Sequence, residues 1–167
     1  YGGANNARVT GDIVLNISGG KIKQGLFGGN NTGNTVNGDV TVNIDWDGTC
    51  NDNYLYDVFG GSNHASVSGS TTVNLLNGTD SNNVYGGGKQ ETVRGENTTV
   101  NIANGNVVHD VFGGGLQGDV YGNVTVLIGK ADGTGTVFIG HDVYGGGSFA
   151  HTNASNRSYD AQDNEVI

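Results

Sequence analysis

Three aspartates that lie close together in this sequence are of the residue type that binds Ca2+. Asp45, Asp47 and Asp52 belong to a segment that begins Asp-Trp-Asp-Gly. Alternating carboxylates followed by a glycine form part of the pattern of a calcium-binding loop, but the distal glutamate of the full pattern is absent. We therefore predict a Ca2+ site at these residues, with solvated turn residues as the alternative.

A second group of acidic and histidine residues recurs at one place in the repeats. Asp57, Asp110 and Asp142 each directly precede a Val-aromatic-Gly-Gly motif, and His109 and His141 precede two of these aspartates. If the repeats stack, equivalent side chains lie above one another, and stacked carboxylates or imidazoles can bind a metal. The alternative is that they are corner residues that interact with the backbone of turns.

The sequence has none of the familiar patterns of a catalytic site. It contains no nucleophile motif, no His-Glu-x-x-His zinc motif and no phosphate-binding loop, and its Gly-Gly-Gly runs are not followed by helical periodicity. No pair of carboxylates stands out as one that could hydrolyse or eliminate sugars. We predict that the chain is not an enzyme and that it has no cofactor beyond the Ca2+ considered above.

The motif [Val/Leu]-[Phe/Tyr]-Gly-Gly organises the whole chain. Its aromatic residue recurs at intervals of 26, 32, 26, 27 and 32 residues. A period in this range indicates a repeat architecture in which equivalent residues stack. The aromatic residues are Tyr1, Phe27, Phe59, Tyr85, Phe112 and Tyr144. We predict that their rings form a stacked column that stabilises the fold; the alternative is an exposed platform for sugars or for a protein partner.

A second recurring element follows each aromatic residue. From Val40 to Ile44, in Val-Thr-Val-Asn-Ile, apolar and polar residues alternate with period two, which predicts a strand with one buried face. One outward position carries an asparagine in four repeats, Asn16, Asn43, Asn74 and Asn101. We predict that these amides hydrogen-bond along the column. The alternative is that the outward threonines form a flat array like the ice-binding surfaces of other β-helices.

Three strands in each repeat define the fold class. A third apolar position, represented by Ile22, Val107 and Ile139, lies five residues before the next aromatic. Three short strands in a coil of about 26 residues predict an all-β fold, a parallel β-helix (β-solenoid) that we expect to be right-handed. We expect glycines to supply positive φ at the corners and to let the chain turn without a Cβ clash. Residues 1–147 are predicted to form five to six coils, and residues 148–167 a degenerate final coil, a cap or a docking tail.

Two repeats are longer than the others. Their insertions, residues 45–54 and 130–138, both follow the alternating strand. Insertions in solenoid proteins map to one face, which is often the binding face. We therefore predict that both loops leave the same edge of the solenoid.

The composition restricts the class of partner. The chain of 167 residues has 32 glycines, no proline and no methionine, and a net charge of −9 with only seven Lys and Arg. This charge argues against nucleic acids and anionic membranes as partners, and no segment is apolar enough for a membrane span. The single cysteine, Cys50, allows no internal disulfide. The missing methionine predicts a processed or partial chain. The small share of charged residues, together with abundant uncharged polar residues, predicts an extracellular or cell-surface location.

Asn-x-Ser/Thr sequences are more frequent than composition alone predicts. They are candidate N-glycosylation sites if the source organism modifies this motif. The asparagines are Asn16, Asn30, Asn77, Asn97, Asn123, Asn153 and Asn156.

The repeat Val-[Phe/Tyr]-Gly-Gly-Gly…Val-x-Gly-[Asp/Asn]-x-Thr-Val-Asn-Ile resembles the Gly-rich β-helix repeats of large bacterial cell-surface and secreted proteins of the adhesin-like or fibre-forming kind. The resemblance covers residues 1 to about 147 and implies adhesion, display or fibre formation. We predict a structural solenoid that assembles head to tail with copies of itself into a filament or stalk. The alternatives are an adhesin or carbohydrate-binding module that recognises surface glycans, and a carbohydrate-cleaving β-helix module.

Overall fold

The alternating strand of each repeat lies in the longest sheet of the fold. The computed structural model describes residues 1–46, 54–78, 80–154, 158–159 and 165–166. Five strands form this long sheet, and each pairs in parallel with the equivalent strand of the neighbouring repeat. In spatial order they are β1 (Ile13–Ile17), β4 (Val40–Asp45), β7 (Thr71–Asn77), β10 (Asn97–Ile102) and β13 (Asn123–Ile128).

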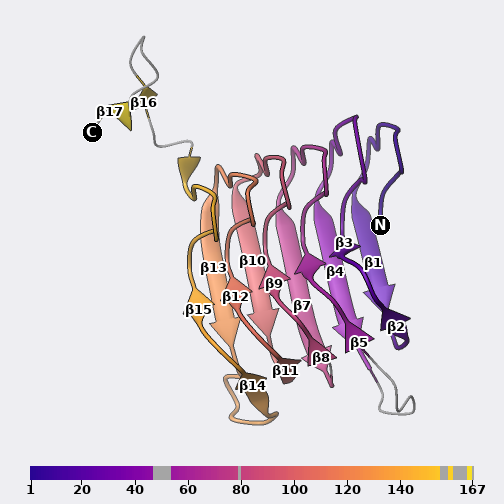
Figure 1. Ribbon diagram of the computed structural model, residues 1–167, viewed down its shortest axis with the longest axis vertical. Helices are drawn as coiled ribbons and strands as arrows, with labels where there is room; N and C mark the ends of the chain where they lie inside the picture. Colours follow the sequence, from indigo (N-terminus) through magenta and orange to yellow (C-terminus); the bar gives the residue numbers. More distant parts are fainter. Residues whose placement is uncertain (47–53, 79, 155–157, 160–164, 167) are drawn as a thin grey trace.

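Two shorter sheets complete each coil, and their strands also stack in sequence order (Figure 1). One contains β2 (Lys21–Ile22), β5 (Tyr54–Leu55), β8 (Asp80–Ser81), β11 (Gly105–Val107) and β14 (Val137–Ile139). The other contains β3 (Leu26–Phe27), β6 (Val58–Phe59), β9 (Val84–Tyr85), β12 (Val111–Phe112) and β15 (Val143–Tyr144). The fold is therefore the predicted all-β parallel solenoid, with successive coils about 27 residues apart.

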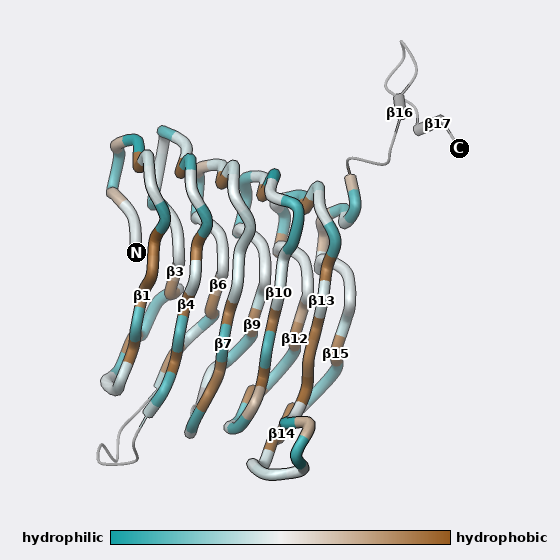
Figure 2. Tube along the Cα trace, turned by 180° about the vertical axis from the view of Figure 1, so that it is seen from behind, coloured by the Kyte–Doolittle hydropathy of each residue, from teal (hydrophilic) through white to brown (hydrophobic). Residues whose placement is uncertain are grey.

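The register of the long sheet stacks identical motif positions. Val73 pairs with Val42 on one side and with Val100 on the other, and all three side chains are completely buried. Figure 2 shows hydrophobic and hydrophilic residues alternating along these strands. The predicted column of inward valines is confirmed, because a one-residue slip would have turned them to the outer face.

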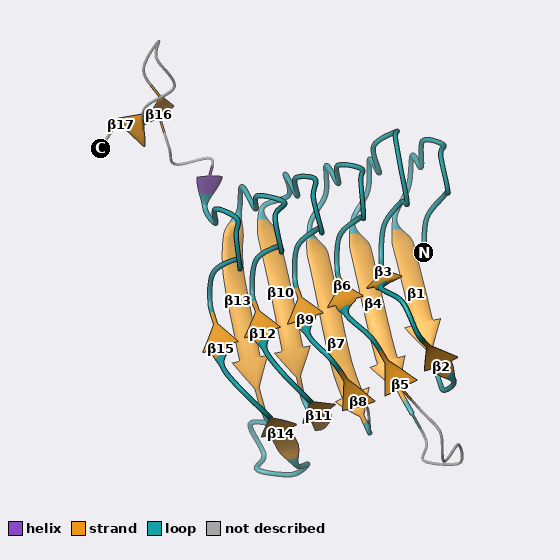
Figure 3. Cartoon of the chain, in the orientation of Figure 1, coloured by secondary structure: helices purple, strands orange, loops and turns teal. Residues whose placement is uncertain are grey.

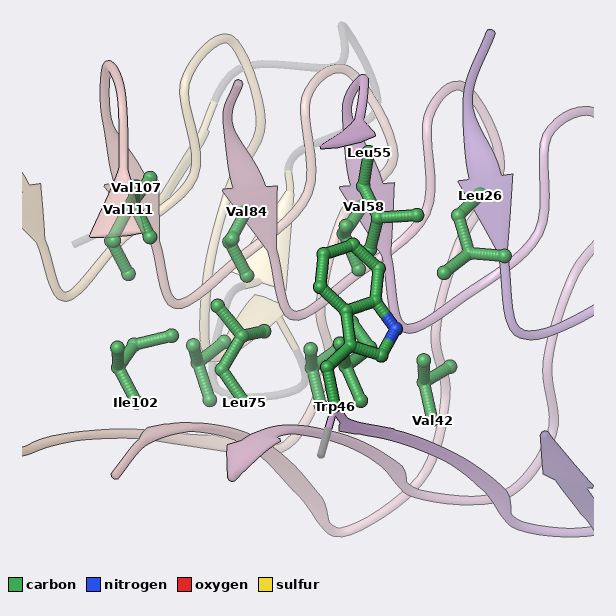
Figure 4. Close-up of a cluster of buried hydrophobic side chains, with 13 residues drawn as sticks. Leu26, Val42, Trp46, Leu55, Val58, Leu75, Val84, Ile102, Val107 and Val111 are labelled. Carbon is green, nitrogen blue, oxygen red and sulfur yellow. The ribbon is translucent and has the colours of Figure 1, made fainter. Parts of the chain in front are cut away.

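The interior is filled from opposite sides by the long sheet and the sheet that carries the aromatic motif. Figure 4 shows Leu26 and Val84 pointing toward the long-sheet residues Val42 and Leu75. Leu26 immediately precedes the motif aromatic Phe27, so the aromatic ring points away from this interior.

Each coil also has an arm, defined as the segment between the motif aromatic and the next long strand, for example residues 28–39. Within the arms, the valine of each Val-x-Gly sequence forms an isolated parallel bridge with the next, joining Val36, Val67 and Val93. These valines pack with Ile13 and Val40 in a second buried cluster. The arm therefore gives each coil a second apolar lobe beside the main interior.

Glycine has two different roles in the fold. The described glycines with positive φ all lie outside the motif, and examples are Gly33 and Gly105. A Cβ added to Gly86, a motif glycine, would overlap the carbonyl oxygen of Gly113 and contact Val100. The expected positive φ is therefore found at glycines outside the motif, whereas the motif requires glycine because adjacent coils approach too closely for a side chain.

Both insertions leave the same edge of the solenoid, as predicted. One lies between β4 and β5 and the other between β13 and β14, and these pairs of strands occupy equivalent places in the same two sheets. In Figure 1 the loop before β14 extends from the lower edge, where β4 also ends. Residues 47–53 of the first insertion lie outside the described part of the chain.

Residues 148–154 continue the arms by one more layer. The N–H of Phe149 donates to the carbonyl of Leu116, and the N–H of Val120 donates to that of His151. The strands β16 (Ser158–Tyr159) and β17 (Glu165–Val166) pair with each other in antiparallel fashion. Figure 3 shows almost no helix, and no helix among the described residues is long and apolar enough to cross a membrane.

Candidate functional site

The six motif aromatics form one continuous stack. Neighbouring ring centroids are 4.7 to 5.0 Å apart, with interplanar angles of 3 to 8°. The four inner rings are only 1 to 8% exposed, whereas Tyr1 and Tyr144 at the two ends are 52% and 45% exposed. Since the inner rings are buried, the column as a whole does not offer the flat face that a platform for sugars requires.

The stack is buried by the arms. Backbone hydrogen bonds from Lys89 to Ser62 and from Leu116 to Gly88 align the arms of successive coils. This alignment places Asn31, Asn63, Lys89 and Leu116 in one column, which we call the arm column. Leu116 packs against the buried rings, so the aromatic stack lies in a concave corner between the short sheet and the arms.

The aspartates that precede the motif serve the stacking of coils. Oδ1 of Asp57 accepts a hydrogen bond from the backbone N–H of Asn83 at 3.3 Å. Oδ1 of Asn83 accepts from the N–H of Asp110 at 3.1 Å, and Oδ1 of Asp110 accepts from the N–H of Asp142 at 3.0 Å. These side chains therefore saturate backbone donors of the following coil.

The same carboxylates affect two tyrosines of the stack. Burial, with the nearby charges of Asp57 and Asp110, raises the pKa of Tyr85 to about 12. The hydroxyl of Tyr144 donates to Oδ2 of Asp142 at 3.1 Å, and this hydrogen bond raises the pKa of Tyr144. Both phenols are therefore held in the neutral form.

The predicted metal sites have two different outcomes. The imidazoles of His109 and His141 stack with centroids 4.9 Å apart, but within the described ranges no group of three His, Cys, Asp or Glu residues is placed to hold a metal ion. Oδ1 of Asp45 accepts a hydrogen bond from Asn77 at 2.7 Å. Asp47 and Asp52 lie outside the described residues, so the Ca2+ site remains a sequence-based prediction.

Asparagine amides form ladders on the outer surface. The residues Asn16, Asn43, Asn74 and Asn101 are joined by Nδ2–H···Oδ1 bonds of 2.8, 2.9 and 3.3 Å. Sequence reasoning missed a second ladder in the arms, which joins Asn5, Asn31 and Asn63 with bonds of 2.7 and 3.0 Å. The repeat offset of 26 or 32 residues between these asparagines was the signal that could have found it.

The sequon asparagines differ in accessibility. Asn16, Asn97, Asn123 and Asn153 are exposed, and Asn77 is half-buried. Asn30 is completely buried, and its Nδ2 donates to the carbonyls of Ala7 and Asn34. In the folded chain Asn30 is therefore closed to a glycosylating enzyme, while Asn156 lies outside the described residues.

One polar groove lies beside the aromatic stack, between the short sheet and the arms of the first coils. Its volume is about 360 Å3. It is lined by Tyr1, Lys23, Gln24, Gly25, Phe27, Tyr56, Asp57, Phe59, Asn63 and Lys89. No sequence motif marks this groove, because its residues come from four successive layers of the solenoid.

A second hollow lies at the end of the last long strand. Its lining includes Leu127, Ile128, Lys130 and Asp132, and its volume is about 650 Å3. Thr134 donates two hydrogen bonds to Asp132, and these bonds lower the pKa of that carboxyl. The hollow is open and follows from the exposed edge of β13, so we regard the groove beside the stack as the candidate site.

Comparison of the chain with protein-family models, curated proteins and solved structures gives no match.

Proposed function

We propose that this chain is a non-catalytic structural solenoid of a cell surface or extracellular material, and that its copies assemble head to tail. The observation that carries the proposal is the open apolar interior at the last coil. Ile128 is 44% exposed, whereas Ile102 directly beneath it is completely buried. Likewise Val143 is 46% exposed, whereas Val111 is completely buried. Another coil stacked on this surface would bury these side chains and gain their hydrophobic stabilisation.

A second copy fits this surface in a definite way. Tyr144 and Tyr1 are the end members of one column of rings, and both are half-exposed. A further coil whose motif aromatic lies on Tyr144 would continue the stack at the same spacing. Its motif glycines would likewise continue the column that ends at Gly145. The two ends differ, so the contact is heterologous and gives an open filament.

The arrangement of strands sets one further requirement on the junction. The aromatic stack has one member more than the long sheet has strands, because β15 carries Tyr144 beyond the coil of β13. A further coil stacked on Tyr144 therefore requires one more long strand beside β13.

The non-catalytic and extracellular parts of the proposal have separate support. The aspartates in the motif column accept hydrogen bonds from backbone N–H groups, which suits a structural role. The glycine-rich composition with low charge and the resemblance to bacterial surface repeats support a location outside the cytoplasm.

The test is a single substitution at the junction. In the inner coils, a Cβ on the first motif glycine overlaps the next coil, whereas a Cβ on Gly145 meets no atom within 4 Å. We expect Gly145→Ala to leave the solenoid folded and to abolish filaments seen by sedimentation and negative-stain microscopy. The matched control is Thr125→Ala, an exposed outward residue of the last long strand, which should still form filaments.

Two results would contradict the proposal. A monodisperse monomer of the unmodified chain at high concentration would rule out head-to-tail assembly. Filaments that persist in Gly145→Ala would rule out the junction described here.

A further inference from the structure

The groove beside the aromatic stack has the shape and chemistry of a ligand site. Phe27 and Phe59 line the groove but are almost completely buried, so they contribute little exposed surface. Tyr56 lies at its side and is 43% exposed, which leaves much of its surface free for contact. Concave sites of this size, with aromatic residues and a few polar groups, are typical of small-ligand sites.

The groove concentrates positive charge in an acidic protein. The chain has a net charge of −9 and only seven Lys and Arg, yet Lys23 and Lys89 both line this groove. Among the described residues, neither lysine has an ion-pair partner. They come from coils two steps apart, which at about 4.8 Å per step separates them by about 10 Å along the solenoid. Two unpaired ammonium groups at this spacing suit a ligand that carries more than one carboxylate.

Lys89 occupies the position at which the amide ladder of the arms would otherwise continue. The amide ladder from Asn5 through Asn31 reaches Asn63, and Lys89 follows Asn63 in the arm column. Among the described residues, Oδ1 of Asn63 is consequently buried without a hydrogen-bond partner. An asparagine at position 89 would continue the ladder and provide the missing donor. Departures from a locally favourable pattern tend to occur at functional positions, so a cation at position 89 points to a ligand.

The groove also has acceptors that distinguish a sugar from a simple polyanion. Oδ1 of Asp57 accepts hydrogen bonds from the side chains of Asn82 and Asn83. Its Oδ2 has no hydrogen bond among the described residues, so it is available to a hydroxyl group. The charge of Asp57 would repel a ligand that carries only carboxylates. We propose that this groove binds a linear acidic oligosaccharide composed of uronic acid units.

Each part of such a ligand has a counterpart in the groove. Sugar carboxylates pair with Lys23 and Lys89, and a hydroxyl donates to Oδ2 of Asp57. The apolar face of one sugar ring packs on Tyr56. A charge-assisted hydrogen bond to each lysine supplies the largest part of the affinity. The contacts proposed here use Lys23, Tyr56, Asp57 and Lys89, none of which is an end member of the ring column.

The experiment is calorimetric titration of the unmodified protein with a hexamer of galacturonic acid. Neutral maltohexaose and hexaglutamate are titrated in parallel. We expect binding of the acidic sugar that weakens with added salt, and at least tenfold weaker binding of both other probes. Lys89→Asn should lower the affinity for the acidic sugar about tenfold, the loss of one charge-assisted contact. Lys130→Ala is the matched control, because it removes an exposed cation outside the groove and should bind as the parent does.

The Lys89→Asn variant is expected to remain folded, so a loss of binding would not result from unfolding. The substitution gives Asn63 a hydrogen-bond partner, so the variant should melt at or above the temperature of the parent. No binding of the acidic sugar by the unmodified protein would overturn the proposal. Equal binding of hexaglutamate would overturn it as well, because recognition would then rest on charge alone.

Discussion

Ser81 is a polar residue in the apolar interior of the solenoid. It occupies the inward column of the short sheet, between Leu55 and Val107, and is completely buried. Its hydroxyl has no hydrogen-bond partner in the described part of the chain. A buried hydroxyl without a partner carries a desolvation cost that is not recovered.

We therefore expect Ser81→Val to raise the free energy of unfolding by about 1 to 2 kcal/mol in urea denaturation. Ser62→Ala is the control, because the buried hydroxyl of Ser62 accepts a hydrogen bond from the N–H of Asn30 at 2.9 Å. This control should lower the free energy of unfolding by about 1 kcal/mol or more. A loss of stability in Ser81→Val would show that the serine hydroxyl is satisfied in solution.

Tyr85 predicts a change of stability with pH. Its pKa in the folded chain is about 12 because it is buried beside Asp57 and Asp110, whereas an unfolded chain has the ordinary value near 10. Between these values the folded state binds more protons than the unfolded state, so stability falls as the pH rises. Below about pH 10 the contribution is complete.

The melting temperature of the parent should therefore fall more steeply between about pH 10 and pH 12 than that of Tyr85→Phe. Phenylalanine already occupies the equivalent place in neighbouring coils, so the substitution should keep the stack. Parallel curves for the two proteins across this range would mean that the phenol titrates normally in the folded state.

At the scale of the structural element, the motif glycines determine how closely coils pack. A Cβ on Gly86 would overlap the backbone of the next coil, where only movement of the whole coil could make room. We expect Gly86→Ala to lower the free energy of unfolding by more than about 3 kcal/mol. The matched substitution is Gly145→Ala, whose added methyl group meets open space in the single chain.

Urea denaturation of these two variants, under conditions that keep the protein monomeric, distinguishes two reasons for glycine in the motif. One is the close approach of coils, and the other is the backbone conformation. Equal stability losses for Gly86→Ala and Gly145→Ala would mean that backbone conformation, rather than the approach of coils, selects glycine. The account requires a large loss for Gly86→Ala and a change within about 0.5 kcal/mol for Gly145→Ala.

At the scale of the whole molecule, the fold is a one-dimensional array. Each coil contacts only its neighbours, and hydrogen bonds, rings and amides all run along one axis. The alternation from Val40 to Ile44 and the recurring aromatics predicted the strands, their parallel stacking and the edge at which the insertions leave. These features repeat in the sequence, so periodicity alone reveals them.

Features that depend on the cross-section of a coil were not predictable in this way. The arm lobe around Val36 and Val67 and the burial of the aromatic rings follow from how one coil folds back on itself. The close approach of coils at the motif glycines follows from the same cross-section. The groove with Lys23 and Lys89 combines positions that are each unremarkable in their own repeat, so no motif marks it.

The central claim is that parallel coils stack along one axis and continue across copies. Fibre diffraction from oriented filaments tests this claim most directly. The strands lie across the axis of the solenoid, so head-to-tail stacking predicts a meridional reflection at about 4.8 Å. Loss of the filaments in Gly145→Ala should remove this reflection. A reflection at about 4.8 Å on the equator would mean that strands run along the fibre, and it would contradict the account.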